Sequence, residues 1–126
     1  MQIIKKSNAK SQIIYFDVDD TLIFESHHDE FGSFVLNDGD GWFYYKAHKN
    51  HVAEFKKLYE EGHQLVIWTS HQLGEEWAAQ VAIALGLDKL SGKCEIICIA
   101  KPDRFYDDMS AQEIFDPSLR WYLSKN

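Results

Sequence analysis

Short apolar runs recur along the chain, and each of them ends abruptly in polar residues. Three runs are rich in branched and aromatic side chains and predict buried strands: residues 12–16 (QIIYF), 64–68 (QLVIW) and 95–100 (EIICIA). A very short fourth strand is expected at 104–106. Residues 34–36 and 42–45 are also β-prone, and the NDGDG between them tolerates the backbone of a tight turn, so they predict a β-hairpin.

Segments with helical spacing lie between the predicted strands. Apolar residues recur every three to four positions in 50–61, and residues 73–85 are rich in alanine; Gly62 and Gly86 provide the two helix ends. A helical turn is expected at 110–115. Because strands alternate with helices, the sequence predicts an α/β fold with a parallel sheet and right-handed crossovers. The length of 126 residues suits one domain, 1–126.

Composition and charge narrow the range of partners. The net charge is −7, and residues 11–45 contain eight carboxylates but no Lys or Arg, which disfavours nucleic acid as a partner. No apolar run approaches the roughly 20 residues of a membrane span, and the first ten residues contain no secretory signal. Cys94 and Cys98 are too far apart on one strand for a disulfide. We therefore expect reduced thiols in a soluble cytoplasmic protein.

Polar side chains that suit phosphate and metal chemistry follow the predicted strands. The four groups are residues 17–21 (DVDDT), Thr69 with Ser70, Lys101 with Pro102, and Asp107 with Asp108. In open α/β sheets, ligands bind beyond the carboxyl ends of the strands. We therefore expect these groups to meet at one edge of the sheet.

The carboxylates in this set favour a bound cation. Asp17 and Asp19 are two positions apart on extended chain and point the same way, so they repel each other unless one is protonated or a cation binds. With Asp107 and Asp108 they form a set that suits Mg²⁺, which prefers few carboxylates together with water and phosphate oxygens. A lysine and a strand-end hydroxyl beside the metal complete the groups that phosphoryl transfer requires.

Four short motifs carry these residues and follow one another along nearly the whole chain. They are YFDVDDTLI, VIWTS, IAKP and FYDD. The first resembles the D-x-D-x-T motif of the haloacid dehalogenase superfamily, and the others are similar to its strand-end Thr or Ser, its lysine and its acidic pair. The resemblance implies a Rossmann-like three-layer fold with a central parallel sheet. It also implies a β-hairpin flap, at about 25–46, in place of a cap domain.

The resemblance further implies a role for each residue of the motifs. Asp17 would be the nucleophile that forms an aspartyl-phosphate, and Asp19 would protonate the leaving group and then activate water. Thr21 would orient the first loop. The other implied roles are phosphate binding by Thr69, Ser70 and Lys101, and Mg²⁺ binding by Asp17, Asp19, Asp107 and Asp108. The chain is thus expected to be a magnesium-dependent phosphatase that acts on a phosphomonoester.

Other interpretations of the same residues remain open. The same chemistry would serve a nucleic-acid 3′-end phosphatase, and a phosphoreceiver-type or non-catalytic phosphate- or metal-binding module would also use acidic residues, Thr and Lys. Thr69 and Ser70 alternatively cap the following helix. His48 and His51 are expected at the surface where a helix starts, whereas His71 is a candidate to face the substrate.

The small flap leaves the expected site open, or covered by another subunit of a homo-oligomer. An open site suits a small phosphorylated molecule or an exposed phosphate on a larger one.

Overall fold

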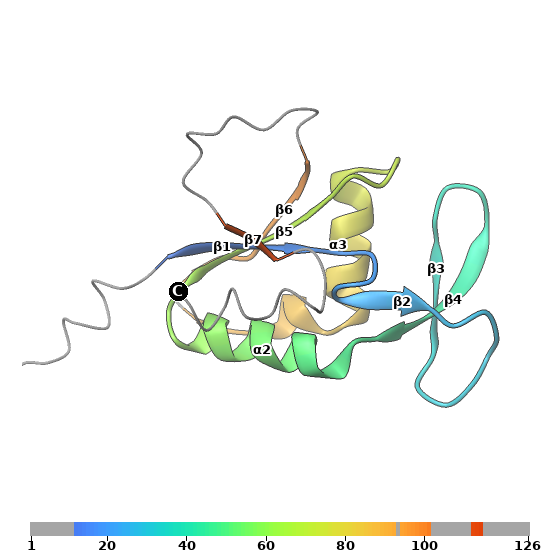
Figure 1. Ribbon diagram of the computed structural model, residues 1–126, viewed down its shortest axis with the longest axis horizontal. Helices are drawn as coiled ribbons and strands as arrows, with labels where there is room; N and C mark the ends of the chain where they lie inside the picture. Colours follow the sequence, from blue (N-terminus) through green and yellow to red (C-terminus); the bar gives the residue numbers. More distant parts are fainter. Residues whose placement is uncertain (1–11, 93, 102–111, 115–126) are drawn as a thin grey trace, which may run out of the picture.

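The computed structural model describes residues 12–92, 94–101 and 112–114 (Figure 1). Their elements, in chain order, are β1 (Ile13–Asp17), β2 (Ile23–Glu25), β3 (Phe34–Asn37), β4 (Trp42–Ala47), α2 (Lys49–Glu60), β5 (Gln64–Thr69), α3 (Glu75–Ala84), the short 3₁₀ helix η1 (Leu87–Lys89), β6 (Ile97–Ala100) and β7 (Gln112–Ile114). Neither of the two α-helices in this part of the chain is long and apolar enough to cross a membrane.

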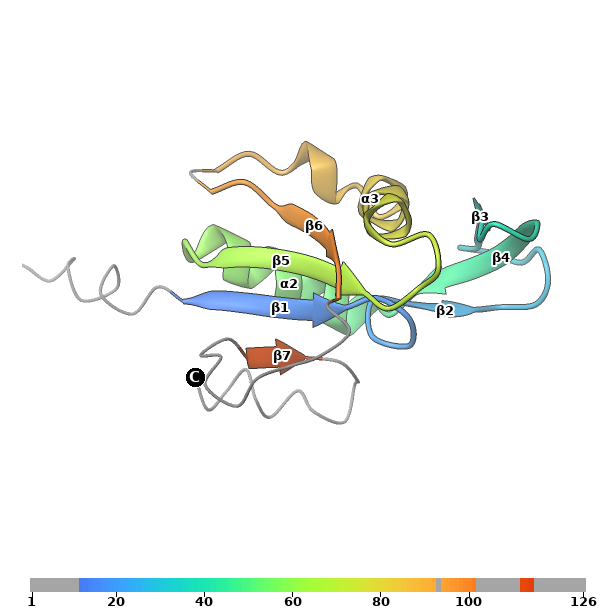
Figure 2. The ribbon, with the colours of Figure 1, turned by 90° about the horizontal axis from the view of Figure 1, so that it is seen from above.

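A parallel sheet forms the centre of the molecule, with strand order β6-β5-β1-β7 (Figure 2). β1 pairs with β5 over its whole length, so that Ile13 lies opposite Gln64 and Asp17 opposite Trp68. All four strands run in the same direction. The α/β fold with a parallel sheet, expected from the sequence, is therefore confirmed, and the carboxyl ends of β1, β5 and β6 share one edge.

Both α-helices pack on the same face of this sheet. Ile14 and Phe16 of β1 point into the core cluster, where Phe16 meets Phe55 of α2 edge-to-face at 5.0 Å. Trp77 and Val81 of α3 belong to the same cluster. This placement follows from the connections, since right-handed crossovers from β1 to β5 and from β5 to β6 step in one direction across the sheet. The described residues do not establish a third layer on the other face of the sheet, so the Rossmann-like three-layer arrangement stays a prediction.

The predicted hairpin is part of a three-stranded antiparallel sheet of order β2-β4-β3, which projects past the carboxyl ends of β1 and β5 (Figures 1 and 2). The sequence did not predict β2, which pairs with β4 from Ile23 to Glu25. Gln80 of α3 fixes the hairpin end, because its Oε1 accepts the Asn37 N–H at 2.9 Å and its Nε2 donates to the Asn37 carbonyl at 3.0 Å. The flap is therefore attached to the body of the protein through α3.

Two expectations from the sequence are wrong. Residues 112–114, expected in a helical turn, form strand β7, because pairing with β1 satisfies backbone groups that β1 would otherwise expose along its edge. His51, expected at the surface, is buried, with its Nδ1 3.1 Å from the Thr21 carbonyl. The expected fourth strand at 104–106 and the pair Asp107 and Asp108 lie outside the described residues.

Candidate functional site

Asp17 and Lys101 meet at the carboxyl edge of the sheet. Asp17 is the last residue of β1, and Lys101 directly follows β6, two strands away. The Lys101 Nζ lies 3.1 Å from Asp17 Oδ1, and the two side chains are 16% and 17% exposed. The ammonium passes 5.5 Å from the ring centroid of Trp68, the β5 residue paired with Asp17. Strand pairing thus joins two predicted site residues that are far apart in the sequence.

The loop after β1 is a tight turn built around Val18. Its carbonyl accepts hydrogen bonds from the N–H groups of Thr21 and Leu22, at 3.2 and 2.9 Å. Asp20 adopts a left-handed backbone with φ of 65°, which Asp tolerates better than most residues. Thr21 is fully buried and its carbonyl faces His51, so it lies at the base of the loop, where the expected supporting role would place it.

Thr69 is the last residue of β5 and Ser70 follows it, and neither of them caps α3. The N-cap of α3 is Gly74, which has no side-chain cap, so the helix-capping alternative is wrong. The buried Thr69 Oγ1 instead accepts the N–H of His71 at 3.0 Å, and its carbonyl accepts the N–H of Lys101 at 2.8 Å. Thr69 therefore ties the second motif to the third, while Ser70 is exposed. Phosphate binding by these two hydroxyls stays a prediction.

Asp17 and Asp19 of the first motif hold a proton more tightly than usual. Burial raises the pKa of Asp17, against the opposing effect of the Lys101 ammonium, and the Asp20 carboxylate raises it further. Asp19 is exposed, but the protein around it still displaces part of its water, and this desolvation raises the pKa of Asp19 as well. The carboxylates of Asp17 and Asp20 act in the same direction. His71 and Trp77 oppose this rise.

The chemistry of these donors fits a divalent cation. The Asp20 carboxylate helps burial raise the pKa of Asp17, and the carboxylates of Asp17 and Asp20 do the same for Asp19, so a cation would relieve this electrostatic repulsion. Within residues 12–92, 94–101 and 112–114, however, no three His, Cys, Asp or Glu side chains come together as a metal-binding group. The remaining predicted ligands, Asp107 and Asp108, lie outside these residues.

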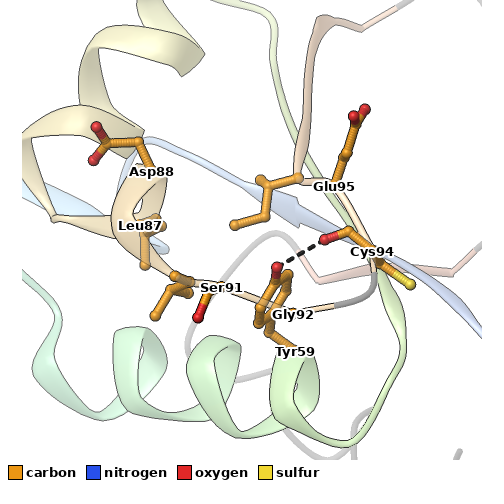
Figure 3. Close-up of a pocket in the computed structure, with 9 residues that line it drawn as sticks. Tyr59, Leu87, Asp88, Ser91, Gly92, Cys94 and Glu95 are labelled. Atoms are coloured by element: carbon orange, nitrogen blue, oxygen red, sulfur yellow. Dashed lines mark hydrogen bonds between the residues drawn. The ribbon is translucent and has the colours of Figure 1, made fainter.

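A separate pocket of about 500 Å³ lies away from this edge, at the end of α2 that precedes β5 (Figure 3). Tyr59 lines the pocket, and its hydroxyl donates a 2.7 Å hydrogen bond to the Cys94 carbonyl. A Cβ on Gly92 would approach the Tyr59 ring to 2.8 Å, so the close packing requires glycine there. The pocket is lined by none of the predicted site residues.

Sequence reasoning missed three residues that influence the loop of the first motif. Trp77 opposes the rise in the pKa of Asp19, and Asp19 is one of three carboxylates that help burial raise the pKa of Tyr45 to about 12. His51 contacts the same loop, with its Nδ1 3.1 Å from the Thr21 carbonyl. Trp77 and Tyr45 lie at apolar positions of a helix and a strand, where the pattern predicts core packing and gives no sign of a second role.

No protein-family model, no curated protein and no solved structure matches this chain. The resemblance to the haloacid dehalogenase superfamily therefore rests on the four sequence motifs.

Proposed function

We propose that this protein is a magnesium-dependent phosphohydrolase of the haloacid dehalogenase type, which cleaves a phosphomonoester through an aspartyl-phosphate on Asp17. The observation that carries the proposal is the contact between Asp17 and Lys101, 3.1 Å apart at the carboxyl edge of a parallel sheet. A strand-end carboxylate beside a partly buried ammonium is suited to attack a phosphorus atom whose oxygens the ammonium attracts. A Rossmann-like three-layer fold is part of this proposal.

Each step of the reaction can be assigned to a side chain. An Asp17 carboxylate oxygen attacks phosphorus, the bond from phosphorus to the leaving oxygen breaks, and Asp19 gives its proton to that oxygen. The raised pKa of Asp19 supports this role, because a general acid must hold a proton near neutral pH. Asp19 then takes a proton from water as the water oxygen attacks phosphorus. Inorganic phosphate leaves and the Asp17 carboxylate is restored.

Lys101 serves this reaction with its charge. Its ammonium holds the Asp17 carboxylate and would attract the phosphoryl oxygens. Thr69 and Ser70 would bind the same oxygens, and Thr21 would keep the first loop in place.

A bound Mg²⁺ would neutralise negative charge on the phosphoryl group. Asp17, the Asp19 carbonyl, Asp107 and Asp108 would hold it. Asp116 is a further acidic residue to test, since in the sequence it follows β7, the strand beside β1, by two positions.

The small size of the flap favours a substrate whose phosphate is accessible, either a small phosphorylated molecule or a phosphate on a larger one. It is a three-stranded sheet rather than a folded cap domain, and α3 holds its end. A second subunit would be able to cover such a site. The acidic balance of residues 11–45 argues against nucleic acid. The free thiols Cys94 and Cys98 support a cytoplasmic location.

The test is release of phosphate from 4-nitrophenyl phosphate, with and without Mg²⁺. Wild type should release phosphate only with the metal, and Asp17→Asn should be inactive. Asp29→Asn makes the same chemical change on the exposed flap and should keep the wild-type rate. Mass spectrometry of Asp19→Asn should detect a phosphoryl adduct on Asp17.

Equal rates for wild type and Asp17→Asn would refute the nucleophile assignment. Metal-dependent binding of phosphate with no turnover would instead support a non-catalytic or phosphoreceiver-type module.

A further inference from the structure

The flap carries most of the large apolar side chains that are exposed in the described part of the chain. Four of the seven belong to it: Phe31 (95% exposed), Val35 (44%), Trp42 (67%) and Phe43 (39%). The other three lie singly on β1, α3 and β6. Apolar side chains that gather on an exposed surface mark a site of interaction, whereas single scattered ones do not.

The register of β3 and β4 divides their side chains between two faces. Tyr45 belongs to the core cluster, so its side of the flap packs against the body of the protein. Tyr44, its neighbour on β4, points to the other side, and so does Trp42, two positions before Tyr44. Val35 lies opposite Tyr44 and therefore shares this side. We call the surface formed by Val35, Trp42 and Tyr44 the outer face of the flap.

Carboxylates stand at both ends of the outer face. Asp38 and Asp40 lie in the turn directly before Trp42, and Asp29 and Glu30 lie in the loop that leads into β3. The two ends are separated by β3, which is four residues, or about 14 Å, long. The outer face is thus an apolar strip with negative charge at each end.

The charge around the outer face favours a cationic partner. Residues 25–46 contain five carboxylates and a single Lys or Arg, Lys46, whose Nζ lies 3.9 Å from Glu30. Opposite charges steer association, and like charges disfavour it. Nucleic acid and an anionic membrane surface therefore fit poorly, and so does a second copy of this chain, whose net charge is −7. An extended polypeptide with apolar residues between basic ones matches both the strip and its ends.

We propose that the outer face of the flap is a docking surface for a polypeptide segment whose apolar residues lie between Lys or Arg side chains. The apolar centre of the segment packs on Trp42, and its basic residues pair with the carboxylates at the two ends. This surface adjoins the candidate site, because Gln72 in the loop after β5 donates from its Nε2 to the Asp38 carbonyl at 3.1 Å. Docking requires no turnover, so it is tested separately from the proposed function.

Fluorescence anisotropy of a labelled peptide, in which leucines lie between pairs of arginines, measures this docking. Wild type should bind the peptide, more weakly as the salt concentration rises, and should not bind a peptide with glutamates in place of the arginines. Trp42→Ser should weaken binding roughly tenfold or more, as truncation of a central interface tryptophan does. Ile83→Ser is the matched control, since Ile83 is 62% exposed on α3, and it should leave binding unchanged.

A second pair of variants tests the acidic ends. Asp38→Asn together with Asp40→Asn should weaken binding roughly fivefold and reduce its dependence on salt. Asparagine keeps a side-chain oxygen that can accept the Asp40 N–H as Asp38 does, so the turn is retained. Glu60→Gln together with Glu61→Gln removes two charges at the end of α2 that lies far from the flap, and should have no such effect (Figure 1).

No binding of the arginine peptide by wild type, or equal binding of the two peptides, would overturn the inference. An equal loss of binding in Ile83→Ser and Trp42→Ser would do the same. Analytical ultracentrifugation tests the other occupant: a wild-type dimer that Trp42→Ser converts to a monomer would show that a second copy covers the outer face, and would also overturn it. Peptide binding by a wild type that releases no phosphate would overturn the proposed function alone.

Discussion

Replacement of Lys101 by Met tests the charge pair at the sheet edge. At the observed separation of 3.1 Å, an effective dielectric constant of about 20 gives a gross attraction of about 5 kcal/mol. Desolvation outweighs much of this, because burial still raises the pKa of Asp17 with Lys101 in place. Loss of the ammonium leaves a carboxylate, 17% exposed, without its charged partner. We expect Lys101→Met to lower the free energy of unfolding by about 2 kcal/mol at about pH 8.

The loss of stability in Lys101→Met should depend on pH, because it comes from the ionised form of Asp17. Without Lys101, the pKa of Asp17 in the folded protein lies still further above its ordinary value. Stability is therefore kept at low pH, where Asp17 is protonated, and is lost as the pH rises through the folded-state pKa. The destabilisation should shrink to less than about 1 kcal/mol at about pH 5.

Urea unfolding followed by tryptophan fluorescence, in metal-free buffer, measures both values. Asp17→Asn in the Lys101→Met background should recover most of the lost stability. Lys46→Met is the control. Its ammonium lies 3.9 Å from Glu30 in a more exposed pair, and its loss should cost roughly 0.2–1 kcal/mol. A Lys101→Met cost that is equal at both pH values, or that Asp17→Asn leaves unrelieved, would refute the reasoning.

Two further predictions concern Asp17 and the flap. In metal-free buffer Asp17→Asn should be more stable than wild type near neutral pH, because the buried carboxylate is costly when ionised, and thermal unfolding should show the gain vanish below the ordinary pKa of 3.8; a gain independent of pH would contradict this origin. Gln80→Ala removes both hydrogen bonds to Asn37, about 1–3 kcal/mol in total, so the Asn37 amide should exchange hydrogen faster. Unchanged exchange would show that other contacts hold the flap.

The local pattern of apolar and polar residues was sufficient to predict elements that form through contacts between residues close together in the sequence. The alternation in 34–45 predicted the hairpin, and the spacing in 50–61 predicted α2, which runs from Lys49 to Glu60. The same approach failed for strand β7, because these residues form a strand only by pairing with β1, about a hundred positions earlier. His51 failed for a related reason: its burial depends on the Thr21 carbonyl, which the fold brings to α2.

The sequence by itself determined the parallel α/β class and the strand ends at which Asp17, Thr69 and Lys101 lie, because apolar runs that stop at polar residues mark buried strands. Only the tertiary structure decided which of these groups touch. Lys101 reaches Asp17 across Trp68 because the strands are ordered β6-β5-β1. The attachment of the flap was likewise decided by the packing of α3, since Gln80 bonds to Asn37, 43 positions earlier in the chain, only because the fold brings the end of the hairpin to this helix.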